Sequence, residues 1–291
     1  MNPVLVVGAG GQVGRALVAR GAFGLTRADL DITDLAQVRA AISARSYRTV
    51  INAVAYTAVD RAESDAAAAQ AVNRDGPGNL AVTTAELGIP LLHVSTDYVF
   101  DGTKQGAYGE SDPVGPVGVY GASKLAGEEA VRAVQPRHII LRTAWVYGPS
   151  NGNFAATMLR LAAERSELRV VADQYGGPTP AAAIADALMT VVDRMGDEGP
   201  WGTYHFSGSP AVTWHGFACA IIDQAAPRLA QSPTVTPIST ADYPTPARRP
   251  ANSVLDCTKI ERVFGIGQPD WRTSLGTIVA AIQDLQGNSA R

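Results

Sequence analysis

Residues 4–14 read VLVVGAGGQVG and join a buried strand to a helix through a glycine-rich turn. A continuous apolar run of this kind is typical of a strand covered on both faces of a parallel sheet. The glycines that follow have the spacing G-x-x-G-x-x-G and stand directly before a helical pattern. Such glycines let the backbone approach a pyrophosphate, and the helix N-terminus offers free N–H groups to it. The stretch predicts a dinucleotide site at Gly8, Gly10, Gly11, Gln12, Val13 and Gly14.

Strand and helix patterns alternate through the first half of the chain. Apolar runs at 23–26, 49–55, 89–94 and 137–142 predict further strands with helices between them. This alternation predicts an α/β fold, a Rossmann-type doubly wound parallel sheet with right-handed crossovers. We expect residues 1–150 to form an NAD(P)-binding Rossmann domain and residues 151–291 a smaller C-terminal α/β substrate-binding region. The boundary is soft, because the chain can return to the sheet after residue 150.

The residues after the second and third strands bear on the cofactor. Arg27 follows the strand 23–26, where an acidic residue would favour NAD and an arginine would accept a 2′-phosphate. Arg27 therefore favours NADPH slightly, with NADH as the alternative. Asp31 and Ile32 lie where an adenine could rest. The strand 49–55 ends in residues that let a nucleotide lie close, namely Ala53, Val54 and Ala55.

A candidate proton-transfer site lies between residues 95 and 124. Thr96 ends the strand that begins at 89, while Tyr120 and Lys124 are four residues apart and share one face of a predicted helix. An ammonium beside a phenol favours the phenolate, which makes the tyrosine usable as an acid or base near neutral pH. Because parallel strands end at one edge of the sheet, the glycine loop should converge with these residues. A chance Tyr-x-x-x-Lys match is the alternative, since the motif alone is weak.

Composition gives no indication of a nucleic-acid-binding, membrane-spanning or disulfide-bonded protein. The chain has 291 residues and a formal net charge of −3, so there is no electrostatic reason to expect nucleic acid or an anionic membrane as a partner. No apolar run approaches the roughly 18 residues that span a membrane. Cys219 and Cys257 lie far apart, so neither a disulfide nor a zinc site is expected. His93 lies in an apolar run and is interpreted as a packing residue. We expect a cytoplasmic protein that binds a small molecule.

The chain resembles the dTDP-4-dehydrorhamnose reductase family of the extended short-chain dehydrogenase/reductase superfamily. The resemblance rests on motifs that occur in order along nearly the whole chain: GAGGQVG, VSTDYVFDG, VYGASKLAGE, RTAWVYG, DQYGGPT and YPTPARRP. It implies reduction by NAD(P)H of the 4-keto group of dTDP-4-dehydro-L-rhamnose, which yields dTDP-L-rhamnose for polysaccharide biosynthesis.

The resemblance also implies roles for individual residues. Tyr120 would donate a proton to the C4 oxygen, and Lys124 would lower the pKa of Tyr120 and bind the nicotinamide ribose. Thr96 would bind the substrate oxygen. Asp97 and Trp145 would line the sugar site.

Three arginines complete this set of expectations. Arg248, or its neighbour Arg249, would meet the nucleotide diphosphate of the substrate. Arg15 stands where some family members carry a glutamate that holds magnesium between two subunits. Because arginine cannot bind a cation, we expect no metal, and a monomer or a weak homodimer.

Two alternatives stay open at the level of the sequence. One is another nucleotide-sugar epimerase, dehydratase or reductase of the same superfamily. A dehydratase of this kind would carry Asp-Glu after the threonine, where this chain has Asp97-Tyr98. The other is a non-catalytic, NADP-binding regulatory subunit, which would have no need of an intact Thr96, Tyr120 and Lys124.

Overall fold

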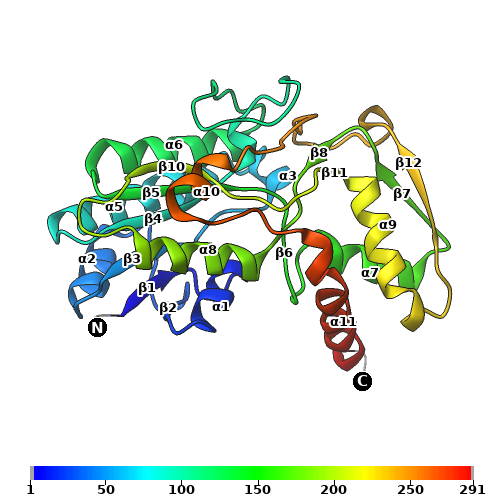
Figure 1. The fold of residues 1–291 in the computed structure, drawn as a ribbon, viewed down its shortest axis with the longest axis horizontal. Coiled ribbons are helices and arrows are strands. Elements are labelled where there is room, and N and C mark those ends of the chain that lie inside the picture. Colours follow the sequence, from blue (N-terminus) through cyan, green and yellow to red (C-terminus); the bar gives the residue numbers. More distant parts are fainter. Residues whose placement is uncertain (1–2, 290–291) are drawn as a thin grey trace.

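The computed structural model describes residues 3–289 and is built on one six-stranded sheet with the strand order β10-β5-β4-β3-β1-β2 (Figure 1). All neighbouring strands of this sheet are parallel. Its strands are β1 (Val4–Val7), β2 (Phe23–Leu25), β3 (Thr49–Asn52), β4 (Leu91–Thr96), β5 (His138–Thr143) and β10 (Gly202–His205). The predicted α/β, Rossmann-type fold is confirmed.

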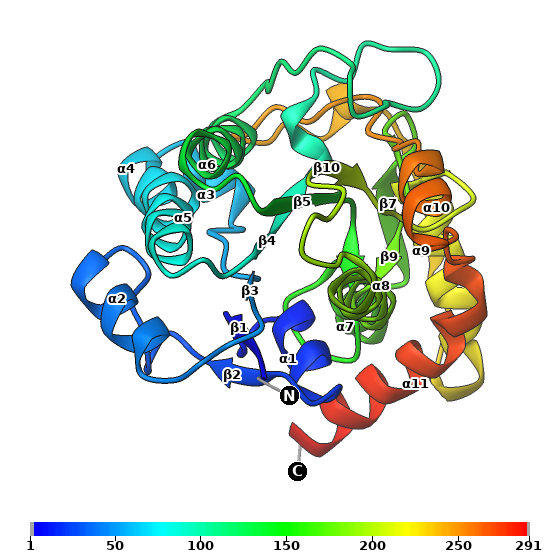
Figure 2. The same ribbon diagram turned by 60° about the vertical axis from the view of Figure 1, so that its left-hand side comes forward.

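Helices cover both faces of this sheet (Figure 2). One face carries α1 (Gln12–Val18) and α8 (Ala181–Arg194), and the other carries α2 (Leu35–Ser43), α5 (Gly76–Glu86) and α6 (Val119–Val134). Alternate strand residues enter the two layers: Val6 packs in the cluster that contains Leu17 of α1, and Leu5 packs in the cluster that contains Leu80 of α5. This double coverage explains why the strands are continuous apolar runs.

A smaller region lies at one end of the molecule, to the right in Figure 1. It has a core of its own, with the buried residues Leu159, Phe217, Ile221 and Leu275. Its main elements are α7 (Phe154–Glu164), β7 (Glu167–Val171), α9 (Trp214–Ala225), β12 (Thr234–Ile238) and α11 (Trp271–Ser289). Between β7 and α9 the chain returns to the large sheet to form α8 and β10.

Short elements connect these layers. The helical ones are α3 (Val59–Ala62), α4 (Ala66–Gln70), η1 (Ala71–Asp75), η2 (Asp97–Val99), η3 (Ala226–Arg228), η4 (Thr240–Asp242) and α10 (Thr258–Phe264). The short strands are β6 (Val146–Tyr147), β8 (Tyr175–Gly176), β9 (Thr179–Pro180) and β11 (Val212–Thr213). Among residues 3–289, no helix is both long and apolar enough to cross a membrane.

The turn between β1 and α1 requires glycine at two positions. Gly8 has a φ of 92°, and a Cβ there would lie 2.8 Å from the carbonyl carbon of Ala53. A Cβ on Gly14 would lie 2.0 Å from the carbonyl oxygen of Gly8. Both obstacles are backbone atoms, which cannot move aside as a side chain can.

Gly14→Ala is therefore expected to destabilise the protein by about 1–3 kcal/mol, the usual cost of overpacking. Thermal unfolding of the two proteins would measure this as a Tm lower by several degrees. Gly10→Ala is the matched control, because a Cβ at Gly10 meets nothing within 4 Å. Equal Tm values for Gly14→Ala and Gly10→Ala would contradict the close approach of α1 to the first turn.

Candidate active site

A cavity of about 480 Å³ lies at the carboxyl ends of the central strands. The predicted catalytic residues Thr96, Tyr120 and Lys124 all line it. Other predicted site residues also line it: Gly11, Gln12, Val13, Ala53, Ala55, Asp97 and Trp145. The structure thus brings the glycine loop, the end of β4 and the Tyr-x-x-x-Lys helix to one place. This is the convergence expected where parallel strands end.

Tyr120 lies in the first turn of α6, half-buried at the cavity wall. Burial raises the pKa of Tyr120 to about 12, and a hydrogen bond between Tyr120 and Thr96 opposes this rise. The sequence led us to expect a pKa of Tyr120 lowered by Lys124, but desolvation of the phenol dominates. Tyr120 is consequently protonated near neutral pH, the state that a proton donor needs.

Lys124 lies one turn further along α6 and is buried, with a relative exposure of 1%. Its Nζ donates a hydrogen bond to the carbonyl oxygen of Val94 at 2.8 Å and lies 3.4 Å from Nε2 of His93. Burial lowers the pKa of Lys124 to about 8, and the nearby carboxylate of Glu128 opposes this shift. Lys124 can therefore exchange a proton much closer to neutral pH than an ordinary lysine.

Thr96 and Asp97 form a buried pair at the end of β4. The Thr96 hydroxyl donates to Oδ1 of Asp97 at 2.9 Å and accepts from the backbone N–H of Tyr98 at 3.2 Å. Burial raises the pKa of Asp97 to about 7. The two short side chains are fixed in place beside the Tyr120 phenol, with the ring of Tyr98 edge-on to that of Tyr120 at 5.8 Å.

An asparagine connects the cofactor side of the cavity to the Tyr120 helix. Asn73 in η1 accepts from the backbone N–H of Tyr56 at 2.8 Å and donates to the Ser123 hydroxyl at 2.9 Å. Ser123 in turn donates to the carbonyl oxygen of Tyr120 at 2.8 Å. These hydrogen bonds fix the position of the loop after β3 relative to the first turn of α6.

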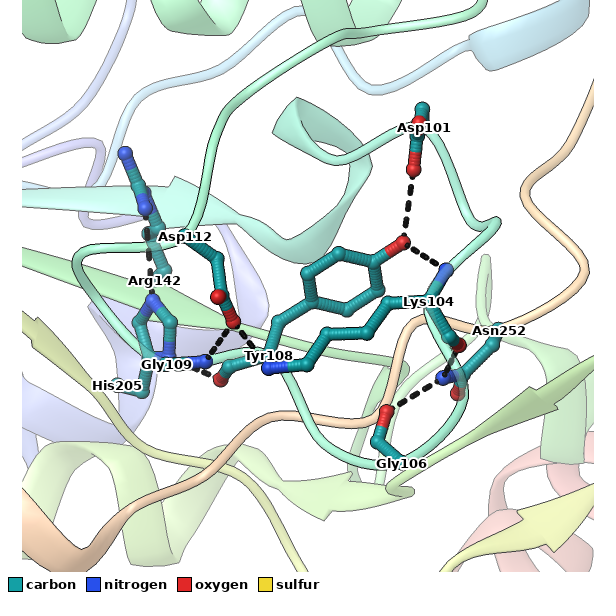
Figure 3. Close-up of polar contacts among 9 residues, drawn as sticks. All are labelled: Asp101, Lys104, Gly106, Tyr108, Gly109, Asp112, Arg142, His205 and Asn252. Atoms are coloured by element: carbon teal, nitrogen blue, oxygen red, sulfur yellow. Dashed lines mark hydrogen bonds and ion pairs between the residues drawn. The ribbon is translucent and has the colours of Figure 1, made fainter.

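The loop between Thr96 and Tyr120 is fixed internally by Tyr108, as Figure 3 shows. The Tyr108 hydroxyl donates to Asp101 at 2.8 Å and accepts from the backbone N–H of Lys104 at 3.0 Å. The Asp112 carboxylate accepts from the backbone N–H of Gly109 at 2.7 Å and from the Lys104 ammonium.

Contacts from distant segments fix the same loop (Figure 3). Asn252 donates to the carbonyl oxygens of Lys104 and Gly106 at 2.8 and 2.7 Å. Nδ1 of His205, on β10, lies 3.0 Å from the carbonyl oxygen of Tyr108. The loop that joins two parts of the candidate site is thus rigid, as pre-organisation of a site requires.

Trp145 has an unusual backbone and a sandwiched side chain. Its φ is 45°, a left-handed value that is rare for residues other than glycine. Its ring stacks on Trp214 with centroids 3.4 Å apart and planes at 4°. A Cβ on Gly176 would lie 2.3 Å from the Trp145 indole, so glycine is required there. Sequence analysis missed Trp214, because it starts an ordinary helical pattern and no motif marks it.

A second cavity of about 570 Å³ adjoins the first and shares part of its wall, including Tyr98, Val146 and Trp214. Its far wall is apolar, with Met158, Leu161, Leu168 and Val170, and its charged lining residues are Arg165, Arg169 and Arg249. An apolar wall combined with arginines suits a nucleoside diphosphate, since guanidinium groups bind phosphate oxygens bidentately.

The two neighbouring arginines of the predicted diphosphate segment differ in position. Arg249 lines the second cavity and donates to Asp60 at 2.8 Å and to Thr245 at 2.6 Å. Arg248 is exposed to solvent. The geometry therefore favours Arg249 over Arg248 for contact with a ligand in this cavity.

The residues expected around the adenosine lie beyond β2. Arg27 and Asp31 are exposed, and Asp31 accepts from the backbone N–H and the hydroxyl of Thr33. These hydrogen bonds lower the pKa of Asp31. Ile32 has a relative exposure of 3% and belongs to the core beneath α2 and α5. The Val54 backbone N–H is bound by Asn52 at 3.0 Å.

Arg15 is exposed at the wall of the first cavity. No group of three or more His, Cys, Asp or Glu side chains within residues 3–289 is placed to hold a metal ion.

Comparison with known proteins gives a consistent picture. The family described as "RmlD substrate binding domain" matches residues 1–284. A dTDP-4-dehydrorhamnose reductase of Aggregatibacter actinomycetemcomitans is 46% identical over 291 residues, which cover 96% of this chain and 99% of that protein. Such identity over nearly the whole of both chains covers the six-stranded sheet and the smaller region alike.

Solved structures agree with the sequence match. A dTDP-4-dehydrorhamnose reductase from Clostridium acetobutylicum is 35% identical with a TM-score of 0.90, covering 97% of this chain and 99% of that one. The enzyme from Bacillus anthracis, solved in complex with NADP, is 34% identical with a TM-score of 0.89, covering 96% and 99%. The chain described here belongs to the dTDP-4-dehydrorhamnose reductase family of NAD(P)H-dependent oxidoreductases.

Proposed function

We propose that this protein reduces the 4-keto group of dTDP-4-dehydro-L-rhamnose to the hydroxyl of dTDP-L-rhamnose, with NADPH as the reductant. One observation carries the proposal: Thr96, Tyr120 and Lys124 line the same cavity as the glycine loop. The adjoining cavity has an apolar wall and arginines, as a nucleoside diphosphate requires. The two cavities together can hold a dinucleotide and a sugar nucleotide side by side.

The residues of the first cavity fit a dinucleotide. A Cβ on Gly8 would collide with the backbone of Ala53 and Val54, just after β3, while the space over Gly10 is open. The Thr143 hydroxyl is buried on the cavity wall and has no hydrogen-bond partner among the described residues. Gly10, Gly11 and Gln12 would hold the pyrophosphate at the start of α1, and Lys124 would bind the nicotinamide ribose.

NADPH is preferred over NADH in this proposal because of Arg27. Its guanidinium is exposed beyond the end of β2, where a 2′-phosphate would lie. Asp31 is already committed to Thr33, so that it offers less to a ribose hydroxyl. The NADP found in the related Bacillus anthracis structure is consistent with this preference.

The sugar would lie between Trp145 and the Thr96–Tyr120 pair, with its nucleotide in the second cavity. NADPH, when bound, supplies the hydride for C4. The Tyr120 hydroxyl, protonated at neutral pH, donates its proton to the C4 oxygen. The Thr96 hydroxyl turns its single proton from Oδ1 of Asp97 to that oxygen and orients it by a hydrogen bond. The Lys124 ammonium stabilises the phenolate that remains on Tyr120.

The first test is an absorbance assay of NADPH oxidation with dTDP-4-dehydro-L-rhamnose as substrate, with NADH in parallel. We expect oxidation that depends on the sugar nucleotide and is faster with NADPH. A folded protein that binds NADPH but oxidises neither cofactor would contradict the proposal. It would indicate either another sugar nucleotide as the substrate or a regulatory role.

Arg249→Ala is expected to raise KM for the sugar nucleotide roughly 10- to 100-fold, because charge-assisted hydrogen bonds are worth about 1.5–3 kcal/mol. The kcat value should change less, since the contact is remote from the reacting carbon. Steady-state kinetics of Arg249→Ala and Arg248→Ala would measure both constants. A larger effect at the exposed Arg248 would contradict the assignment.

We also propose that the reaction needs no metal ion and that the protein is a monomer or a weak homodimer, because Arg15 replaces the glutamate that would bind magnesium. Dialysis against EDTA is expected to leave kcat and KM unchanged. Loss of activity that magnesium restores would overturn this part of the proposal. Sedimentation of the dialysed protein would report the oligomeric state in the same samples.

A further inference from the structure

His93 is a buried histidine next to the candidate site. Its hydrogen-bond contacts assign one protonation state to its ring. It lies on β4 with no exposed surface. Its Nδ1 is 3.0 Å from Nδ2 of Asn52, on the neighbouring strand β3, and its Nε2 is 3.4 Å from Nζ of Lys124. The three side chains form a line that runs behind the cavity wall and ends at the catalytic lysine.

The orientation of the Asn52 amide follows from the backbone. Oδ1 of Asn52 accepts from the backbone N–H of Val54 at 3.0 Å. A flipped amide would place its NH₂ group against that N–H, with two donors facing each other and no acceptor. Nδ2 of Asn52 therefore faces His93 and donates to it.

The tautomer of His93 follows from the amide. Because Asn52 donates to Nδ1, this nitrogen carries the lone pair, and the proton of the neutral ring is on Nε2. Burial and the Lys124 charge both lower the pKa of His93 well below its ordinary value, so the ring stays neutral. The group that His93 presents to Lys124 is consequently an N–H donor.

The charged ammonium of Lys124 can donate hydrogen bonds but cannot accept one. It therefore forms no hydrogen bond with Nε2–H of His93, which is also a donor. The unprotonated amine has a lone pair and can accept from Nε2–H, while its own N–H still reaches the Val94 carbonyl oxygen. We propose that Asn52 and His93 are positioning residues that present Nε2–H to Lys124 and thereby stabilise its unprotonated amine. The inference rests on the proposed function, since only there is Lys124 a catalytic group.

The pair is a fixed support and passes no proton on, because the Asn52 amide cannot release one. Its effect is on Lys124, which gives up a proton near neutral pH and regains it from solvent. The titratable and charged groups around Lys124 and His93 are Tyr120, Glu128 and Arg132 on α6, Asp97 after β4, and Arg142 and His138 on β5. The Glu128 carboxylate is already bound by Arg142 and Arg132.

The direct test is ¹⁵N NMR of the imidazole rings in histidine-labelled, wild-type protein, which has only 4 histidines. Nitrogen shifts and couplings separate the two neutral tautomers. We expect the His93 ring, identified by its absence in His93→Gln, to be the neutral Nε2–H form and to stay so from pH 6 to about 9. A proton on Nδ1, or on both nitrogens, would overturn the inference.

Asn52→Asp tests the consequence for Lys124. The carboxylate still accepts from Val54, but its second oxygen needs a donor, so it draws the His93 proton to Nδ1 and turns the Nε2 lone pair towards Lys124. We expect the pH at which kcat falls on the alkaline side to rise by at least one unit, with the tautomer inverted in the spectrum. An inverted tautomer with an unmoved alkaline limb would overturn the link to Lys124.

These readouts separate failure of the inference from failure of the proposed function. The wild-type spectrum needs neither substrate nor turnover and decides the tautomer even if Asn52→Asp does not fold. His215→Gln is the matched control for histidine replacement, since His215 lies on α9, outside the first cavity, and bonds the Val235 carbonyl oxygen. It should leave the alkaline limb in place.

Discussion

Tyr120→Phe is expected to lower kcat by about 10²- to 10⁴-fold, the range that a positioned general acid contributes. The variant loses only the hydroxyl that donates the proton, and the ring keeps its edge-on contact with Tyr98. NADPH binding should remain close to that of the wild type. Stopped-flow or steady-state NADPH oxidation gives kcat, and fluorescence titration gives the cofactor affinity of the same preparation.

Tyr47→Phe is the control for loss of a phenol. Tyr47 is buried before β3, at the amino ends of the strands and thus at the opposite edge of the sheet from the site. Near-normal kcat in Tyr120→Phe would show that another group donates the proton. Loss of kcat together with NADPH binding would instead point to a structural effect of Tyr120.

Lys124→Met is expected to lower kcat/KM by about 10²-fold or more and, unlike Tyr120→Phe, to weaken NADPH binding. Methionine keeps the length of the side chain but removes the charge and the hydrogen bond to Val94. The pH dependence gives a second signature. Burial lowers the pKa of Lys124 to about 8, so the ammonium is lost as the pH rises through that value.

In the wild type, reduction should consequently slow above about pH 8, whereas an unperturbed lysine would keep its charge to about pH 10. This alkaline limb should be absent from the low residual activity of Lys124→Met. Lys259→Met is the matched control, because Lys259 lies on α10 and lines neither cavity. An alkaline limb of unchanged position in Lys124→Met would assign that titration to another group.

Features that depend on local chemistry were predictable from the sequence. A continuous apolar run predicts a strand covered on both faces, and β1 is such a strand. Gly14 is required because the carbonyl oxygen of Gly8, in the preceding turn, leaves no room for a Cβ. Tyr120 and Lys124 share a helix face because the α-helix repeats every 3.6 residues. These rules act over a few residues, so the sequence alone was enough to place them.

Other features depend on which distant segments meet. The return of β10 to the sheet, the stack of Trp214 on Trp145 and the choice of Arg249 over Arg248 involve contacts between segments far apart in the chain. An apolar run or a pair of arginines has the same sequence whichever distant segment it contacts, so the sequence does not indicate the partner.

His93 shows most clearly what could not be predicted from the sequence. The sequence predicted a packing histidine in an apolar strand, and the residue is indeed buried. Its neighbours are decided by strand order, which places β3 beside β4 and so brings Asn52 to one ring nitrogen, while α6 brings Lys124 to the other. The sequence by itself determined the strands, the glycine turn and the Tyr–Lys pair, because these follow from local geometry. Only the tertiary structure decided what surrounds that pair, because hydrogen bonds between buried side chains depend on how strands and helices pack.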